Sequence, residues 1–172
     1  DLIYLPEVPF DEDAFLAEVE RLHREKGGVV VVASEGLRKA DGEPIVEPIF
    51  QVGRAVYYGD VSAHLANLVI RKLGIKARSE KPGIAGRASA AYQSRLDRDE
   101  AVEAGSTAVR AAVEGKNGVM VGFRRLPGEE YRAETILIPI EEVMLHERTM
   151  PKEFIAENGH DVTQAFIDWC RP

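Results

Sequence analysis

The chain has 172 residues, of which 45% are hydrophobic and 30% are charged, as is typical of a globular domain with one buried core. A net charge of -7 argues against a general nucleic-acid-binding protein, although a small anionic ligand needs only a local basic pocket. No apolar run reaches the roughly 20 residues of a membrane-spanning helix, and the single cysteine, Cys170, excludes an internal disulfide and fits a cytoplasmic location.

The first elements follow a strand, helix, strand order. The apolar run "LIYL", residues 2–5, predicts a buried strand that Pro6 ends, and no basic stretch of a signal peptide precedes it. Asp11 is the expected N-cap of the next helix, which Gly27 ends. The apolar stripe of this helix consists of Phe15, Leu16, Val19 and Leu22. Residues 29–33, "VVVVA", predict a strand covered on both faces, as the strands of parallel sheets are.

The middle of the chain predicts an excursion and a second helix. Residues 38–60 contain two prolines and three glycines, and we expect a long excursion that includes a hairpin. Ser62 is the expected N-cap of a helix that ends at Gly74. The core face of this helix is expected to be Leu65, Leu68, Val69 and Leu73. Residues 75–79, "IKARS", are expected to form a further strand.

The last third of the chain predicts a long helix, two strands and a final helix. The long helix is expected to begin at Asp97, with Glu100 completing a capping box, and to end at Gly115. Its inner face is expected to carry the small residues Ala101, Gly105, Ala108 and Ala112. "GVMVGF" and "TILIPI" predict strands, and Asp161 is the expected N-cap of the final helix. The element order predicts one α/β domain over residues 1–172, a Rossmann-like three-layer arrangement with helices flanking a mainly parallel sheet.

Basic side chains gather in one segment of this acidic chain. Residues 75–101 contain Lys76, Arg78, Lys81, Arg87, Arg95 and Arg98. Ser34 and Glu35 directly follow the strand at residues 29–33, and ligands of α/β sheets bind beyond the carboxyl ends of the strands. A carboxylate accepts hydrogen bonds from hydroxyl groups and arginine binds phosphate oxygens in bidentate fashion, so this combination suits a polyhydroxylated, phosphorylated ligand.

A glycine-containing turn lies within the same basic segment. Gly83 and Gly86 would let backbone N–H groups approach a phosphate, and Arg87 follows directly. Two plainer interpretations stay open: Glu35 as a solvated carboxylate, and residues 83–86 as an ordinary turn. A P-loop is excluded because "EGKNG" ends a helix rather than opening one, and the four histidines have no metal-ligand spacing.

Five segments, in this order along the chain, resemble one known family. They are "DLIYLPEVPFDEDAFLAEV", "VVVVASEG", "LGIKARSEKPGIAGRAS", "SRLDRDEAVEAGSTAVRAAVEGKNGVMV" and "MPKEFIAENGHDVTQAFIDWCRP". Together they resemble the C-terminal half of the phosphofructokinase family, and its pyrophosphate-dependent bacterial branch in particular. The resemblance is specific because it covers nearly the whole chain in the correct order.

The resemblance implies roles for individual residues in binding fructose 6-phosphate. Glu35 would contact the sugar hydroxyls, and Arg87 would hold the 6-phosphate while Ile84 lines the same pocket. Arg78 would reach a 6-phosphate bound by the neighbouring subunit, so the resemblance also implies a homo-oligomer, either a dimer or a tetramer. The residues expected to support the binding loop are Ser34, Lys81, Gly83 and Gly86.

Three positions depart from the family pattern. Ile84 stands where histidine is common, and isoleucine has no group that contacts phosphate. Gly86 stands where glutamine is frequent, and Ala66 and Asn67 replace an expected pair of glycines. These departures predict a weaker affinity for the sugar phosphate or an altered substrate.

The resemblance also indicates what this chain does not contain. The family's donor-binding glycine motif, its catalytic aspartates and its Met-Gly-Arg motif precede the matching region, so no catalytic residue and no metal ligand is assigned within these 172 residues. The chain would be a fragment that supplies the fructose 6-phosphate site and depends on its own N-terminal half as a partner. By itself it is expected to be inactive.

The complete enzyme is expected to transfer a phosphoryl group to the 1-hydroxyl of fructose 6-phosphate in glycolysis. Pyrophosphate is favoured over ATP as the donor, and Mg²⁺ is the implied cofactor. The alternative is a non-catalytic sugar-phosphate-binding or oligomerisation module derived from the same family. Neither nucleic acid nor a membrane is expected as a partner.

Overall fold

The computed structural model describes residues 1–53, 55–84, 88–144 and 147–171. The chain divides into two compact units. Unit 1 comprises Asp1–Lys81 and Met150–Arg171, and unit 2 comprises Pro82–Thr149. Both units contain helices and strands, which confirms the predicted α/β class. The prediction of a single domain over the whole chain stays a prediction.

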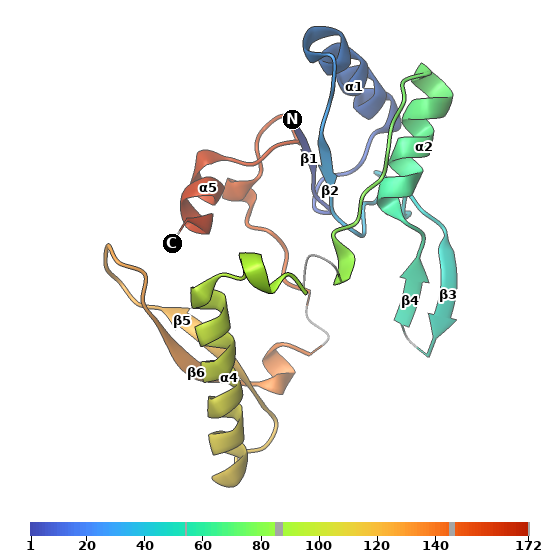
Figure 1. Ribbon diagram of the computed structural model, residues 1–172. Coiled ribbons are helices and arrows are strands. Elements are labelled where there is room, and N and C mark those ends of the chain that lie inside the picture. The colour runs from blue at the N-terminus through green and yellow to red at the C-terminus, as the bar shows by residue number, and fades with distance from the viewer. Residues whose placement is uncertain (54, 85–87, 145–146, 172) are drawn as a thin grey trace. The chain divides into compact units, whose positions relative to one another are not determined.

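Unit 1 is built on a parallel strand pair joined by a helix (Figure 1). β1 spans Leu2–Tyr4, α1 spans Glu12–Lys26 and β2 spans Val31–Ala33. α1 begins where the sequence predicts, because the Asp11 carboxylate accepts a hydrogen bond from the Ala14 N–H at 2.8 Å. It also ends where predicted, at Gly27, whose φ of 77° favours glycine.

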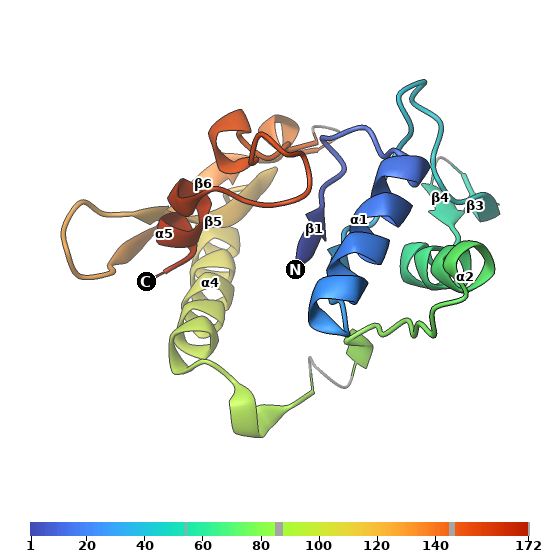
Figure 2. The same cartoon turned by 90° about the horizontal axis from the view of Figure 1, so that it is seen from above.

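A second helix, α2 (Val61–Leu73), lies beside α1 over the same core (Figures 1 and 2). One cluster holds the buried apolar side chains of unit 1: Leu2, Phe10, Phe15, Leu16, Val19, Leu22, Leu37, Ile45, Val61, Leu65 and Val69. The predicted apolar stripe of α1 is buried in full, which confirms that prediction. Burying one such side chain contributes about 1.5–3 kcal/mol, so this cluster is the main source of stability in unit 1.

The two faces of β2 differ, in contrast to the predicted cover on both. Val31 and Ala33 pack against the core cluster, whereas Val32 and the preceding Val30 are 58% and 64% exposed. The difference arises because α1 and α2 both pack on the core-facing side of the pair. Among the described residues, nothing buries the opposite side of β2.

The start of α2 also differs from the prediction. Asp60, not Ser62, is the N-cap: its carboxylate accepts hydrogen bonds from the Ala63 N–H at 3.1 Å and from the Ser62 hydroxyl at 2.6 Å. The prediction of Ser62 was therefore wrong. The helix already includes Val61, which is only 7% exposed and packs into the core from the first turn. The predicted end at Gly74, with a φ of 67°, is confirmed.

The region between β2 and α2 contains the predicted hairpin. β3 (Pro48–Val52) and β4 (Ala55–Tyr58) pair antiparallel. The strand predicted at residues 75–79 does not form, because these residues pair with no strand of the described chain. They run instead as an unpaired segment in which half-buried and exposed side chains alternate.

The last part of the chain returns to β1. The Ile3 N–H donates to the His160 carbonyl oxygen at 2.9 Å, and the Met150 N–H donates to Glu7 Oε1 at 2.7 Å. A 3₁₀ turn (Lys152–Phe154) and α5 (Gln164–Cys170) lie in this part. α5 begins after Thr163, so the prediction of Asp161 as N-cap was wrong; the Asp161 carboxylate accepts from the adjacent Val162 N–H instead.

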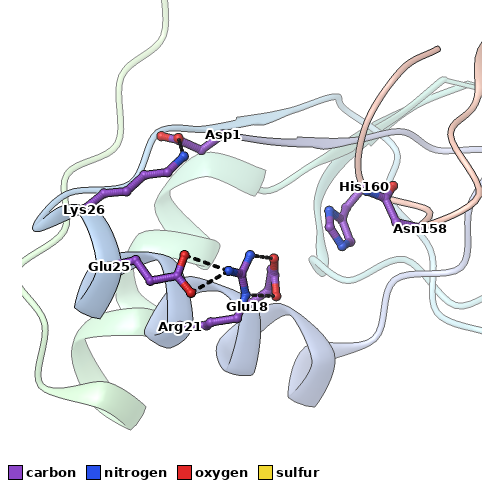
Figure 3. A network of polar contacts seen from close by, with 7 residues as sticks. All are labelled: Asp1, Glu18, Arg21, Glu25, Lys26, Asn158 and His160. Atoms are coloured by element: carbon purple, nitrogen blue, oxygen red, sulfur yellow. Dashed lines mark hydrogen bonds and ion pairs between the residues drawn. The ribbon is translucent and has the colours of Figure 1, made fainter.

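Charged side chains on the outer face of α1 form a network of ion pairs (Figure 3). Arg21 binds Glu18 and Glu25, and these carboxylates hold the pKa of the guanidinium above its usual range. The Lys26 ammonium lies 2.6 Å from Asp1, whose second oxygen accepts from the Val30 N–H at 2.9 Å. Surface pairs of this kind add little stability, but the Asp1 contacts hold the first residue against the start of β2.

Unit 2 is a helix beside an antiparallel strand pair. α4 spans Arg95–Val113, β5 spans Val119–Arg125 and β6 spans Ala133–Pro139, with 3₁₀ turns at Ala90–Tyr92 and Ile140–Glu142. Both strands form where the sequence predicts. The Tyr131 hydroxyl donates to Glu100 Oε1 at 2.7 Å and so links the turn before β6 to the helix.

The inner face of α4 is not the one that the sequence predicts. Ala111 is the buried residue of this helix, whereas the predicted small residues Ala101, Gly105, Ala108 and Ala112 are all exposed. The N-cap is Ser94, whose hydroxyl accepts from the Asp97 N–H at 3.3 Å, so the prediction of Asp97 was also wrong. Ala111, which is buried, and Glu100, which is half-buried and accepts the bond from Tyr131, lie on the same side of the helix.

Tyr4 provides a test of the packing of unit 1 in alkaline solution. Its ring packs edge-on against Phe10 and Phe15, and burial, together with the charge of Glu18, raises its pKa to about 12. The unfolded-state pKa is about 10, so this core is fully stable below pH 10 and loses stability as the pH rises toward 12. We expect Tyr4→Phe to show a smaller loss of unfolding free energy in that interval, measured by urea denaturation. A Tyr92→Phe control, at a 91% exposed position, should behave like the wild type; equal behaviour of both variants would contradict the prediction.

Candidate functional site

Ser34 and Glu35 lie directly beyond the carboxyl end of β2. The Ser34 N–H donates to the Tyr4 carbonyl oxygen at 3.1 Å, so the parallel pairing continues to the residue before Glu35. Glu35 then turns into solvent with Gly36, whose φ is 79°. Leu37, only 1% exposed, returns the chain to the core immediately afterwards. The Glu35 carboxylate is therefore presented to solvent on a short turn that is anchored on both sides.

The N-termini of α1 and α2 lie at the same end of unit 1. α1 follows β1 and crosses back to β2, so its first turn lies at the carboxyl edge of the strand pair. Asp11 of the α1 cap and His64 in the first turn of α2 line one shallow cavity, which places both helix starts together. This edge is where α/β proteins bind ligands.

The segment after α2 returns to that edge. Ile75 and Ala77 pack against the core cluster, whereas Lys76 and Arg78 are exposed between and after them. The Lys81 ammonium lies 3.4 Å from Asp60 Oδ2, at the N-cap of α2. The segment thus runs antiparallel to α2 along its length, and it brings Lys81 to the edge where Ser34 and Glu35 lie.

Asp60 fixes the electrostatics of this part of the site. Its pKa is lowered below the usual aspartate value by the hydrogen bond from Ser62, by the Ala63 N–H and by Lys81. Lys81 therefore lies against a carboxylate that is ionised at neutral pH. The sequence interpretation missed Asp60, although an aspartate directly before an amphipathic helix was the available signal.

The remaining predicted site residues lie outside unit 1 or outside the described residues. Gly83 has a φ of 50° and belongs to unit 2, as does Ile84, which is 81% exposed. The Ile84 carbonyl accepts from the Ala88 N–H at 2.8 Å. Gly86 and Arg87 lie outside the described residues. The structure thus places Ser34, Glu35 and Lys81 at one edge of unit 1, and the binding roles of these and of the other residues stay predictions.

The cavity at the helix starts does not suit an anionic ligand. It has a volume of about 410 Å³ and is lined by Phe10, Asp11, Glu12, Asp13, Lys39, Ile45 and His64. Its three carboxylates outnumber the single lysine, so a phosphate placed here would meet net repulsion. None of the predicted binding residues lines it, and we do not assign it to the ligand.

Within the described ranges 1–53, 55–84, 88–144 and 147–171, no three histidine, cysteine, aspartate or glutamate side chains come together as a metal site. The same part of the chain contains no helix that is both long and apolar enough to cross a membrane. Cys170 is exposed and unpaired by any disulfide.

The amino-acid sequence is similar to curated phosphotransferases over almost its full length. It is 36% identical over 180 residues to pyrophosphate--fructose 6-phosphate 1-phosphotransferase of Rhodospirillum rubrum, covering 99% of this chain and 44% of that protein. The protein of the same name from Xanthomonas campestris pv. campestris is 33% identical over 166 residues, covering 95% of this chain and 40% of the relative. A sulfofructose kinase of Alkalicoccus urumqiensis is 30% identical over 170 residues, covering 98% and 42%. No family model matches the chain.

Solved structures of the same kind match the fold. The pyrophosphate-dependent phosphofructokinase of Marinobacter aquaeolei has a TM-score of 0.72 and 30% identity, covering 95% of this chain and 38% of its own. That of Nitrosospira multiformis also has a TM-score of 0.72 and 30% identity, covering 99% and 38%. The chain therefore spans less than half the length of the relatives that it matches.

Substitutions of Asp60 test how much this N-cap contributes to the stability of unit 1. Removing the cap with Asp60→Ala should lower the free energy of unfolding by about 1 kcal/mol. Asp60→Asn should cost less, because its amide oxygen still accepts from the Ala63 N–H. The pKa of Asp60 in the folded chain lies below the unfolded-state pKa of about 3.9. The ionised carboxylate therefore stabilises unit 1 above pH 3.9, and this stabilisation is lost as the pH falls through the folded-state pKa. Urea denaturation should show wild type and Asp60→Asn differing at neutral pH and converging in acid; a constant difference would contradict this.

Proposed function

This chain is related in sequence and in fold to the pyrophosphate-dependent phosphofructokinases, and we propose that it is the fructose 6-phosphate-binding part of such an enzyme. The observation that carries the proposal is the match of 99% of the chain to a protein named for transfer between pyrophosphate and fructose 6-phosphate. The chain matches less than half of that protein, so the activity belongs to a longer polypeptide of which these residues would form the C-terminal half. Residues 1–172 would form its single sugar-phosphate-binding domain.

Glu35 and the basic segment supply the chemistry that fructose 6-phosphate requires. Glu35 is exposed beyond β2, where its carboxylate would accept hydrogen bonds from sugar hydroxyls. Arg87 would bind the 6-phosphate in bidentate fashion, with Ile84 lining the same pocket. Arg78 is exposed on the segment that runs along α2, which supports its assignment to a 6-phosphate in a neighbouring subunit of a homo-oligomer.

Ser34 and Lys81 would support this binding loop from the edge of unit 1. The Ser34 backbone hydrogen bond to Tyr4 holds the turn that presents Glu35. Lys81 is held by Asp60 at 3.4 Å, and this pair would fix the start of the loop that contains Gly83 and Gly86. The carboxyl edge of the parallel pair, with Glu35 and Lys81, would therefore position the sugar.

The complete protein would also complete the sheet. We propose that the exposed side of β2, at Val30 and Val32, is covered by residues beyond this chain. That cover would produce the Rossmann-like three-layer arrangement with a mainly parallel sheet. Parallel sheets are buried on both faces, which supports this proposal.

Phosphoryl transfer would depend on residues that this chain does not supply. By the family resemblance, Mg²⁺, which neutralises charge on transferring phosphoryl groups, would be held in the complete enzyme by the half that precedes this region. The chain alone would bind fructose 6-phosphate without converting it. We also propose a cytoplasmic location, where a glycolytic sugar phosphate would be available.

A second candidate substrate is a sugar that carries a sulfonate in place of the phosphate. Ile84 offers no donor for a phosphate oxygen, and one relative matching 98% of the chain is named a sulfofructose kinase. A sulfonate carries less negative charge than a phosphate and needs fewer donors. The same binding measurement distinguishes the two ligands.

Calorimetric titration of the chain with fructose 6-phosphate tests the proposal. We expect Arg87→Ala to weaken binding by roughly tenfold to a hundredfold, which corresponds to about 1.5–3 kcal/mol for one charged phosphate contact. The matched control is Arg71→Ala, an exposed arginine in the last turn of α2, at the opposite end of that helix from Lys81. The control should bind like the wild type.

Three outcomes have distinct meanings. Weaker binding by Arg87→Ala alone supports a phosphate site on the basic loop. Equal weakening by both arginine variants would indicate a general charge effect and contradict the assigned site. If the folded chain binds the sulfonated sugar more tightly than fructose 6-phosphate, the second candidate replaces the first.

A further inference from the structure

We propose that Lys81 is a binding residue that changes partner: its ammonium lies against Asp60 until a sugar phosphate binds, and it then contacts the phosphate. This inference rests on the proposed function, because the ligand is the sugar phosphate assigned to the carboxyl edge of unit 1. Lys81 and Asp60 both belong to unit 1, so the pair is defined within one compact unit. Its two members come from the segment after α2 and from the N-cap of α2.

Asp60 is the fixed member of the pair. Its Oδ1 accepts from the Ser62 hydroxyl at 2.6 Å and from the Ala63 N–H at 3.1 Å, while its Oδ2 faces Lys81. The pKa of Asp60 is lowered first by the Ser62 hydroxyl and then by the Ala63 N–H, and Lys81 contributes less than either. The dipole of α2 also favours a negative charge at its N-cap. The carboxylate therefore keeps its position and its charge when the ammonium moves away.

Lys81 is the movable member of the pair. Its ammonium lies 3.4 Å from Asp60 Oδ2, beyond the about 2.7–2.9 Å of a charge-assisted hydrogen bond. Its side chain is 57% exposed, and ion pairs of such exposure contribute little because water competes for both charges. Lysine carries three donors on a flexible stem, so the ammonium can reorient while the backbone stays in place. Leaving Asp60 therefore costs Lys81 little free energy.

A phosphate attracts the Lys81 ammonium more strongly than Asp60 does. A phosphate monoester carries a charge of about -1.5 to -2 at neutral pH and three acceptor oxygens. Asp60 carries a single charge, and its Oδ1 is already occupied by the cap of α2. The exchange of partner is therefore favourable when a sugar phosphate reaches the carboxyl edge. Lys81 raises the affinity for that ligand, and Asp60 lowers it by competing for Lys81.

The test is calorimetric titration of the 172-residue chain with fructose 6-phosphate and, separately, with fructose. We expect Lys81→Ala to weaken the binding of fructose 6-phosphate by about tenfold, the loss of one charged contact. Asp60→Asn should strengthen it by about twofold to fivefold. The reason is that the asparagine oxygen still caps α2, whereas the uncharged amide no longer competes for Lys81.

Asp11→Asn and Lys72→Ala are the matched controls. Asp11 caps α1 as Asp60 caps α2, and Lys72 lies in the last turn of α2, at the opposite end from Asp60. Both controls should bind fructose 6-phosphate like the wild type. A control that changes affinity as much as its matched variant would indicate a general charge effect and overturn the proposal. Weaker binding by Asp60→Asn would also overturn it.

The comparison with fructose separates this inference from the proposed function. A wild-type chain that binds fructose 6-phosphate no more tightly than fructose would contradict both. A wild-type chain that prefers fructose 6-phosphate, loses this preference with Arg87→Ala and keeps it unchanged with Lys81→Ala would overturn the exchange of partner alone. The proposed function would then stand without a contact from Lys81.

Discussion

The parallel hydrogen bonding of β1 with β2, joined through α1, is the constraint on which the rest of unit 1 depends. It sets the carboxyl ends of both strands at one edge and, because α1 crosses back antiparallel, sets the start of α1 at the same edge. The bond from the Ser34 N–H to Tyr4 extends this pairing by one residue and thereby determines where Glu35 leaves the sheet. Lys81 reaches that edge by a different route, along α2 to its N-cap Asp60. A carboxylate and a cation, more than 40 residues apart in sequence, are in this way delivered to one end of a small core.

Incomplete packing recurs in both units and agrees with a chain that spans less than half of its relatives. In unit 1 the outer side of β2 exposes two valines although a parallel pair favours cover on both faces. In unit 2 a helix of 19 residues, α4, buries Ala111 and leaves its small-residue side exposed. Unpacked apolar surface of this extent is stabilised by contact with further protein, either the remainder of the polypeptide or another copy. Both observations agree with the proposal that this chain is one part of a longer polypeptide.

Capping residues in the sequence predicted the ends of α1 correctly, but they failed at the starts of α2 and α4, where two candidate N-caps lie close together. Asp11 and Gly27 bound α1 as expected: the Asp11 carboxylate accepts from the Ala14 N–H, and Gly27 adopts the positive φ that ends the helix. At α2 and α4 a serine and an aspartate lie within three residues of each other, so the sequence alone did not decide which of the two caps the helix. The strand predicted at residues 75–79 could not be judged from its own composition, since a strand exists only with a partner. The location of Glu35 could be predicted because this residue follows β2 directly. The pairing of Lys81 with Asp60 could not, because it depends on the direction in which the segment after α2 runs.

We propose that fructose 6-phosphate binds at the carboxyl edge of unit 1, where Ser34, Glu35 and Lys81 lie. The most direct test is to titrate the isotopically labelled chain with fructose 6-phosphate and to follow the backbone amide signals by NMR. We expect the largest changes at residues 34–35 and 78–81, with smaller ones at the start of α2. Changes confined to the acidic cavity around Asp11 and His64, or no change in a folded chain, would contradict it.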